Sequence, residues 1–558
     1  MLRRARLLWS LWVLTVVAIA PASAQNAAEL KSAPLSVESA SVQAAAARDR
    51  VQELLREGRQ LESGEQWGDA LSLYEDALRD FPNDRSLRER HDQSRIQFDV
   101  ARRYHDESFR RAVTTLTRSD ALAVYNDVLL KIESHYVHSP DYAQLVDHGL
   151  STFDAALAKD SFVEVNLRGV GRDAIDTFRA DVRRTVKARA ARNRFETREV
   201  VAEVADLGAK QLGLSASATI LEFTCGAAAS LDHYSTYLTA DQLRDVFSQI
   251  EGNFVGLGIE IKSVDDALLL VHVIPGSPAA TAGLRMGERI VSVDGHTTKG
   301  VSTDGAASLL QGAEGSVCSL TIAAADGESR EVRVRRANVD VPSVENAKVL
   351  DPATGVAYLK LACFQKTTAR DLDTALWQLH NAGMKSLIVD LRGNPGGLLT
   401  AAVEIADRFV ASGTIVSTRG RSPQEDFNYT AHRVGTWQVP LVVLIDGDSA
   451  SASEIFAAAI QDNHRGAIVG RRSYGKGSVQ GIFPLNLAGL GDSGGIRLTT
   501  AKFFAPSGRA ISDAGVTPEV VVQRTAKPVA ETGKIPTEGD DADLQAGIQV
   551  ARRQVASR

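Results

Sequence analysis

The stretch from residue 441 to residue 480 constrains the fold more than any other part of the chain. An apolar run at 441–445 has the length of a buried strand, apolar residues after Ser451 recur at helical spacing, and a second apolar run follows at 467–470. This order predicts a strand–helix–strand crossover, which is almost always right-handed and pairs its two strands in parallel. The loops after both strands then emerge at the same carboxyl edge of a sheet.

These two loops carry a candidate nucleophile and a candidate base. The first loop holds Ser449, Ser451 and Ser453, and the second holds Lys476 between two glycines. A serine hydroxyl is a weak nucleophile at its ordinary pKa. A lysine amine accepts its proton only when burial or nearby positive charge keeps the amine neutral.

Each loop also has a simpler explanation. Ser451 with Glu454 fits a capping box at a helix start, and residues 475–477 fit a solvated turn. Arg471 and Arg472 are candidates for the positive charge that a neutral lysine would need. The serine and the lysine are harder to dismiss jointly than singly.

Together the two loops resemble the catalytic core of the C-terminal processing peptidases, also called tail-specific proteases. The resemblance rests on SASE at 451–454, on GKGSVQ at 475–480, and on the 25 positions between residue numbers 451 and 476. It implies that Ser451 is the nucleophile, that Lys476 is the base and that Gln480 orients the lysine.

The resemblance also implies a multidomain α+β protein. The expected parts are an N-terminal α-helical region, a PDZ β-barrel-like domain and an α/β catalytic core of the ClpP/crotonase-like kind. The expected boundaries are a signal peptide at 1–24, a linker at 25–47, a helical region similar to a tetratricopeptide (TPR) repeat at 48–115, a helical peptidase region at 119–240, a PDZ domain at 250–337, the serine peptidase core at 341–525 and a C-terminal tail at 526–558.

The first residues have the layout of a cleaved secretory signal. Arg3, Arg4 and Arg6 precede a mostly apolar run at 7–20, and the small residues 22–24 follow it. An uncleaved anchor would need about 20 apolar residues, so this run is short for one. We therefore expect an exported protein, periplasmic or otherwise extracytoplasmic.

Residues 51–84 resemble one tetratricopeptide repeat. In this interpretation the small residues Gly58 and Ala70 let two helices pack closely, and Pro82 ends the second helix. A single repeat cannot bury its own face, so it would lean on a helix predicted at 85–111 or on a protein partner. The alternative is an ordinary helical hairpin without a binding role.

Two long helices are expected further on, at 121–136 and 182–214. After them, LDHYSTYL at 231–238 is similar to the stretch that precedes the PDZ domain in the same peptidase family. It departs from the family pattern at His233, which replaces a proline, and at Tyr234, which replaces a histidine. We interpret His233 as a turn residue and not as a catalytic base.

Residues 252–336 resemble a PDZ domain, mainly through the run GERIVSVDG at 287–295. A glycine-bearing loop can turn consecutive backbone N–H groups toward an anion, and an adjacent strand edge can pair with an extended peptide. The alternative for the loop alone is a plain hairpin turn. The residues implied for capture of a substrate's C-terminal carboxylate are Leu257, Gly258 and Ile259.

The sequence DLRGNPGG at 390–397 follows a strand expected at 386–390 and matches a motif of the same family. A Gly-Gly turn after a parallel strand exposes backbone amides at the sheet edge already inferred for the serine and the lysine. The amides of Gly396 or Gly397, with that of Ala452, would form an oxyanion hole. A flexible turn is the simpler explanation of the glycines alone.

The sequence thus predicts an exported serine endopeptidase that recognises protein C-terminal tails through its PDZ domain. The alternative is a catalytically silent PDZ/TPR adaptor protein, and a hydrolase of nonprotein acyl groups is a further rival. The net charge of −6 without a long basic run argues against nucleic-acid binding. We expect no metal site and no cofactor, and the expected partners are proteins or peptides with free C-termini.

Overall fold

The computed structural model describes residues 37–264, 267–299, 309–323, 329–432, 436–485, 494–522 and 541–557. The signal peptide predicted at 1–24 lies outside the described residues, as does the first part of the predicted linker. The chain divides into two compact units, one of residues 1–102 with 524–537 and one of residues 103–523 with 538–558. No helix in the described ranges is long and apolar enough to cross a membrane.

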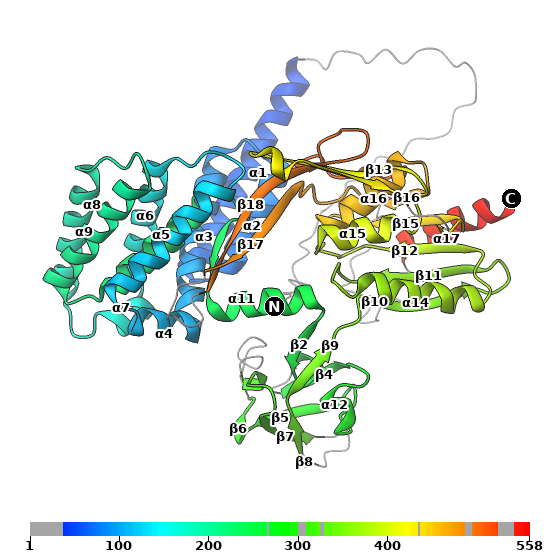
Figure 1. Ribbon diagram of the computed structural model, residues 1–558, viewed down its shortest axis with the longest axis horizontal. Coiled ribbons are helices and arrows are strands. Elements are labelled where there is room, and N and C mark those ends of the chain that lie inside the picture. Colours follow the sequence, from blue (N-terminus) through cyan, green and yellow to red (C-terminus); the bar gives the residue numbers. More distant parts are fainter. Residues whose placement is uncertain are drawn as a thin grey trace. The chain divides into compact units, whose positions relative to one another are not determined.

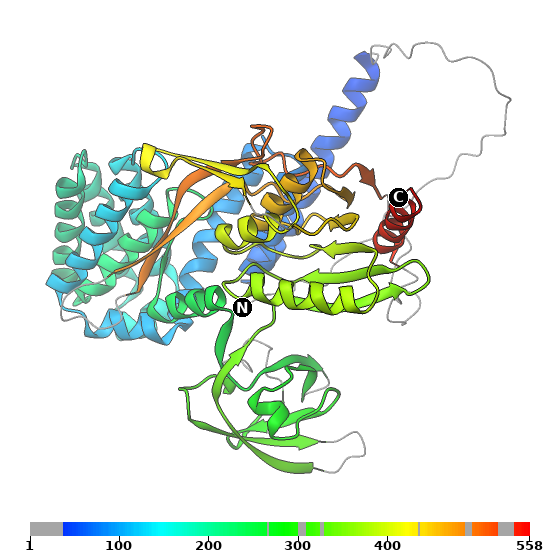
Figure 2. The same ribbon diagram turned by 45° about the vertical axis from the view of Figure 1, so that its right-hand side comes forward.

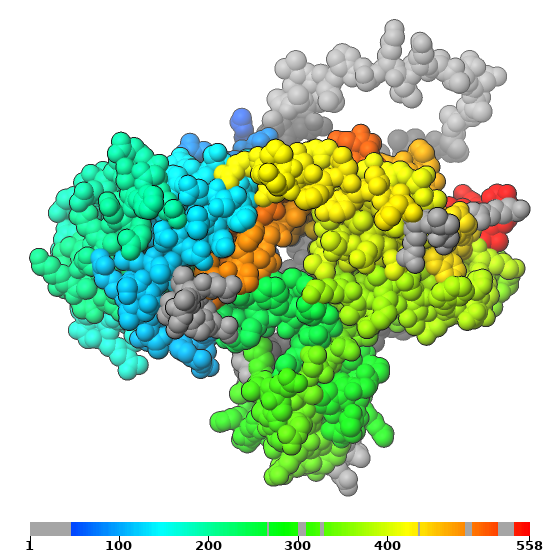
Figure 3. Space-filling view, viewed as in Figure 1, coloured from blue at the N-terminus to red at the C-terminus, as the bar shows by residue number. Residues whose placement is uncertain are grey.

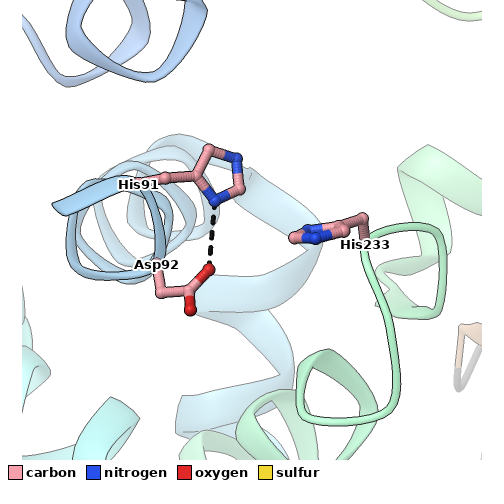
Figure 4. Close-up of side chains that lie close together, drawn as sticks. All are labelled: His91, Asp92 and His233. Atoms are coloured by element: carbon pink, nitrogen blue, oxygen red, sulfur yellow. Dashed lines mark hydrogen bonds and ion pairs between the residues drawn. The ribbon is translucent and has the colours of Figure 1, made fainter. Parts of the chain in front are cut away.

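The first unit is built from helices. Its elements are α1 (Val37–Ser63), α2 (Trp67–Asp80) and most of α3 (Arg85–His105). A Cβ on Gly58 would lie 2.1 Å from the Tyr74 hydroxyl, so the small residue predicted there does allow α1 and α2 to pack closely. Residues 37–47 are helical where a linker was expected, because their many alanines favour a helix. Within α3, His91 Nδ1 lies 3.0 Å from the Asp92 carboxylate (Figure 4).

The helical peptidase region packs around one buried helix. Its helices are α4 (Glu107–Thr115), α5 (Arg118–His135), α6 (Tyr142–Ala158), α7 (Asp160–Asn166), α8 (Arg172–Lys187), α9 (Arg194–Leu212) and α10 (Ala216–Ala229). Helix α10 is apolar on nearly all sides and is covered by α5, α6 and α9. The single helix predicted at 182–214 is wrong, because Asn193 Oδ1 caps a new helix by accepting from Phe195 N at 3.0 Å.

The PDZ domain is a small barrel-like sheet joined to the core by a two-stranded ribbon. Helix α11 (Ala240–Glu251) precedes it, and its elements are β2 (Asn253–Gly256), β3 (Ile259–Val264), β4 (Ala267–Val273), α12 (Pro278–Thr281), β5 (Arg289–Val293), β6 (His296–Thr297), β7 (Val317–Ala323), β8 (Ser329–Arg335) and β9 (Ala337–Asp340). The sheet order is β3-β4-β5-β7-β8, with β6 beside β5, and β2 pairs with β9. Strand β3 therefore stands at the edge of the described sheet.

The peptidase core contains a six-stranded sheet in the order β10-β11-β12-β15-β16-β19. Strand β10 is antiparallel to β11, and the other pairs are parallel. The strands are β10 (Val344–Asp351), β11 (Val356–Leu361), β12 (Ser386–Asp390), β15 (Leu441–Ile445), β16 (Ala467–Gly470) and β19 (Val520–Val521). One face packs against α14 (Thr368–Asn381), α15 (Leu399–Ala406) and α16 (Ala452–Asp462).

The opposite face of this sheet is covered by α17 (Ala542–Ala556). Both views of the ribbon place this red helix beside the strands (Figures 1 and 2). The sequence predicts a C-terminal tail at 526–558 with a terminal helix at 541–555, and the helix α17 buries Leu544 and Ala551 against Val356, Ile388 and Leu444. The last helix is thus a layer of the catalytic core.

A second sheet joins the helical region to the core. Its order is β1-β18-β13-β14, with β17 also paired to β18. The elements are β1 (Thr236–Leu238), β13 (Gly413–Gly420), η1 (Pro423–Glu425), β14 (Phe427–Ala431), β17 (Ser478–Pro484) and β18 (Gly495–Phe504). Val137 N also donates a hydrogen bond to Thr499 O of β18 at 2.8 Å. In the space-filling view the orange segment that contains β17 and β18 lies between the cyan helical region and the yellow-green core (Figure 3).

Candidate active site

Three loops of the core meet at the carboxyl edge of the parallel sheet. They follow β12, β15 and β16, which are neighbours in that order and run parallel. The parallel pairing predicted for 441–445 and 467–470 is confirmed. Because parallel strands end at one edge, the loops at 391–398, 446–451 and 471–477 share that edge.

Ser451 occupies a strained position at the start of α16. Its backbone angles, φ 55° and ψ −114°, lie where a residue with a side chain is seldom found. Such a conformation costs about 1–3 kcal/mol and persists only when the surroundings impose it. Ser451 N donates to Glu454 Oε2 at 2.8 Å, and Ala450 N donates to Asn394 O at 3.0 Å. Strain of this kind clusters at functional sites.

The neighbouring serines have structural contacts instead. Ser449 and Ser453 are fully buried. Ser449 Oγ donates to Leu391 O at 2.9 Å, and Ser453 Oγ donates to Asn394 O at 3.1 Å. Both hydroxyls thus tie the loop that carries Ser451 to the loop after β12.

Glu454 links the serine loop to the lysine loop. Its side chain is fully buried. One carboxylate oxygen accepts from Ser473 Oγ and Gly475 N, each at 2.6 Å, and the other accepts from the backbone N of Ser451 and of Lys476, each at 2.8 Å. Burial raises the pKa of Glu454 above its ordinary value, although these hydrogen bonds favour the ionised form. One side chain therefore fixes the distance between the two loops.

The amine of Lys476 is shielded by the helical region. Lys476 Nζ lies 4.6 Å from the centroid of the Tyr234 ring. Burial and, to a smaller extent, the Arg497 guanidinium lower the pKa of Lys476 to about 8, while the carboxylates of Glu454 and Asp232 act in the opposite direction. Arg497 Nε is itself held by Tyr234 O at 2.9 Å. At mildly alkaline pH a substantial fraction of this amine is therefore neutral.

Positive charge near the lysine thus comes from Arg497 of β18, whereas Arg471 and Arg472 were the candidates for part of it in the sequence. Arg471 Nη2 lies 3.9 Å from the Asp446 carboxylate, and Arg472 Nε donates to Ala514 O at 2.7 Å. The sequence interpretation did not include Arg497, because β18 reaches the site by antiparallel pairing with β17. Nearness along the chain did not reveal that contact.

Gln480 lies on β17 with one half of its amide engaged. Gln480 Nε2 donates to Thr499 Oγ1 at 2.9 Å and to Ser478 Oγ at 3.2 Å. Gln480 Oε1 is buried without a hydrogen-bond partner among the described residues. Within the same residues no hydrogen bond joins Ser451 Oγ to Lys476 Nζ, although Glu454 links the backbones of the two loops.

The glycine loop after β12 packs directly against Ser451. Gly396 has φ 100°, and a Cβ on it would lie 2.8 Å from Ser451 Cβ and 2.9 Å from Ala452 N. Gly396 N donates to Asn394 Oδ1 at 2.9 Å. Gly397 N and Ala452 N have no hydrogen-bond acceptor in the part of the chain that the structure describes. One of these two amides follows Gly396 in the glycine loop, and the other follows Ser451 in the chain.

The candidate carboxylate loop of the PDZ domain lies between β2 and β3. Ala279 N donates to Leu257 O, and Ile274 N donates to Gly258 O, each at 2.9 Å. Gly258 has φ 79°, and Ile259 begins the edge strand β3. The loop is thus positioned by its carbonyls beside a strand edge that can accept a peptide.

Two residues that shape the site were not assigned to it from the sequence. Glu454 was interpreted only as half of a capping box, and Tyr234 only as a departure from a family pattern. The sequence motifs include both positions, but the contacts of Glu454 and Tyr234 in the site are made with chain segments far apart in sequence. His233, by contrast, lies on the exposed turn between α10 and β1 (Figure 4).

Comparison with known proteins identifies the family. Residues 355–522 match the model of peptidase family S41, and residues 271–324 match a PDZ domain model. The chain is 37% identical over 306 residues to the carboxy-terminal-processing protease of Bartonella bacilliformis. The aligned region covers 54% of this chain and 68% of that relative. The chain belongs to peptidase family S41.

A second S41 relative is similar over the same extent. The carboxyl-terminal-processing protease of Synechocystis sp. is 35% identical over 306 residues, covering 54% of this chain and 69% of that relative. A solved structure titled photosystem II D1 C-terminal processing protease is 25% identical, covers 72% of this chain and 93% of that chain, and has a TM-score of 0.37. This S41 chain is a serine peptidase with a PDZ domain, and the predicted fold class is confirmed.

Proposed function

We propose that this S41 peptidase is an exported endopeptidase that cleaves proteins near their C-termini with a Ser451–Lys476 dyad. The observation that carries the proposal is the Glu454 carboxylate, which binds the backbone amides of both residues at the edge where the glycine loop touches Ser451. The names of the relatives agree with tail processing. The secretory layout of residues 1–24 supports export to the periplasm or another extracytoplasmic space.

The cleavage begins with capture of a substrate tail. The loop of Leu257, Gly258 and Ile259 binds the terminal carboxylate, and the extended peptide adds to the edge of β3. This arrangement selects chains with a free and unfolded end. A protein partner of the TPR-like region at 48–115 stays a prediction.

The chemistry then takes place at the sheet edge. Lys476 turns from the Tyr234 ring toward Ser451 and accepts the hydroxyl proton as the oxygen attacks the peptide carbonyl. Gln480 Oε1, which has no partner among the described residues, accepts a hydrogen bond from the resulting ammonium. The amides of Gly397 and Ala452 bind the negative oxygen of the tetrahedral intermediate. Lys476 passes the proton to the leaving amine, and water then hydrolyses the acyl-enzyme.

The dyad predicts a pH profile with an acid limb near 8. Only the neutral form of Lys476 can accept a proton, and its pKa is lowered to about 8, so kcat/KM should rise as pH increases and level off above that value. The measurement is kcat/KM for one peptide from pH 6 to pH 10 at constant ionic strength. In Arg497→Gln the limb should move to higher pH, because a positive charge that lowers the pKa is removed. A profile that is flat between pH 6 and pH 9 contradicts the assignment of the base.

Tail recognition is tested with one unfolded protein in two forms, with a free and with an amidated C-terminus. We expect the free form to be cleaved faster at limiting substrate concentration, since amidation removes the charge that the Leu257–Gly258–Ile259 loop would bind. Mass spectrometry of the fragments gives both rate and cleavage position. Equal rates and equal fragments for the two forms would exclude tail capture, and no cleavage of either would favour the silent adaptor.

A further inference from the structure

Helix α17 docks on the strands that carry the active-site loops. Leu544 and Ala551 pack with Ile388 of β12 and Leu444 of β15. A Cβ on Gly547 would lie 2.9 Å from Leu444 Cδ2, so the glycine lets the helix approach the sheet closely. The packing places the first turn of α17 where it can reach the loop after β12.

At that point Asp541 binds the side chain of Arg392. Arg392 Nη1 and Nη2 donate to the two oxygens of Asp541 at 2.7 Å and 2.9 Å, which is a bidentate pair. Asp541 also caps α17, because its Oδ1 accepts from Leu544 N at 3.1 Å. The carboxylate of Asp543 lies 3.6 Å from Arg392 Nη1. The guanidinium is mostly buried, so solvent weakens these contacts little.

Arg392 in turn shapes the start of the glycine loop. Its Nε and Nη2 donate to Asp390, and its backbone N donates to the same carboxylate at 2.9 Å. This turn leads into Asn394, whose N donates to Leu391 O at 3.1 Å and whose Oδ1 accepts from Gly396 N at 2.9 Å. Hydrogen bonds therefore join α17 to the turn at 390–392, and the chain continues directly from this turn into the loop that touches Ser451.

We infer that Asp541 is a positioning residue for the oxyanion hole, acting through Arg392 from a helix at the far end of the chain. The inference rests on the proposed function, because it assigns the Gly397 amide to the tetrahedral intermediate. The Arg392 side chain that Asp541 binds also binds Asp390, at the turn from which the glycine loop departs.

The test uses Asp541→Asn in the full chain. Asparagine is as good a helix cap as aspartate, so the substitution removes the charged pair and leaves α17 capped. We expect kcat to fall about 10-fold to 100-fold, at most the effect of removing one oxyanion donor, and KM to stay within twofold of the wild-type value. A peptidyl boronate, which forms a tetrahedral adduct on serine, should bind more weakly by the same factor. Amide hydrogen exchange within 391–397 should become faster.

Two further variants separate positioning from folding. Asp541→Glu keeps the charge and should recover part of kcat and of boronate affinity. Gln549→Ala, an exposed position on α17, should match the wild type in both. Wild-type kcat and boronate affinity in Asp541→Asn overturn the inference, as does a loss confined to KM or to thermal stability. If the wild type itself does not cleave, the proposed function fails. In that case, hydrogen exchange at 391–397 that is the same in Asp541→Asn and in the wild type also shows that Asp541 does not position the loop.

Discussion

Replacement of Ser451 by alanine is expected to lower kcat by about 10⁴-fold or more, since loss of a serine nucleophile leaves only the residual catalysis of binding and the oxyanion hole. The strained backbone at Ser451 and the packing of Gly396 against its Cβ motivate the choice of this serine among three. Cleavage of an unfolded protein, followed by mass spectrometry, measures the loss. The KM of any remaining activity and the affinity for a tail peptide should change little.

The matched control for this variant is Ser453→Ala. Among the described residues Ser453 Oγ donates one hydrogen bond, to Asn394 O at 3.1 Å, so its removal should cost about 0.5–1.5 kcal/mol of stability. The loss of kcat in Ser453→Ala should be at least 100-fold smaller than in Ser451→Ala. If Ser451→Ala retains wild-type activity, the dyad is wrong. Should Ser453→Ala lose as much as Ser451→Ala with its fold intact, the nucleophile has been assigned to the wrong serine.

Replacement of Lys476 by methionine is expected to lower kcat by about 10³-fold, in the middle of the range for removal of a general acid–base group. Methionine keeps an unbranched chain of similar length but offers no amine. Lys476→Arg should be equally inactive, because a guanidinium stays protonated and cannot accept the serine proton. Single-turnover kinetics would place the loss in the acylation step, before the acyl-enzyme forms.

An exposed lysine on β18 provides the control for charge alone. Lys502→Met removes one positive charge from β18, the strand that also carries Arg497, and should keep kcat within twofold of the wild-type value. Thermal unfolding checks that the Lys476 variants retain the fold. Substantial activity of Lys476→Met at any pH between 7 and 10 would show that another group takes the proton.

The sequence predicted those parts of the site that depend on local order along the chain. The parallel strands at 441–445 and 467–470 followed from apolar runs of strand length on either side of a helical pattern, and the structure confirms them. The position of the glycine loop beside Ser451 followed from the shared edge of parallel strands. Both inferences needed only periodicity and the handedness of crossovers.

Other parts could not be predicted, because they depend on contacts between distant segments. The ring of Tyr234 lies over Lys476 only because β1 pairs with β18. The four donors to Glu454 come from both loops, whereas the sequence shows only its spacing from Ser451. The role of α17 in the core was missed because a polar stretch separates it from the sheet that it covers.

The pairing of β1 with β18 bears on how the protein can be divided for biochemical work. The register joins Thr236 to Arg497 and Leu238 to Gly495, so the helical region contributes a strand to the sheet of the catalytic core. A fragment that began after this strand would expose an unpaired edge of β18, which is a template for aggregation, and would remove the ring over Lys476. Recombinant fragments meant to retain proteolysis should therefore include the helices from α4 onward.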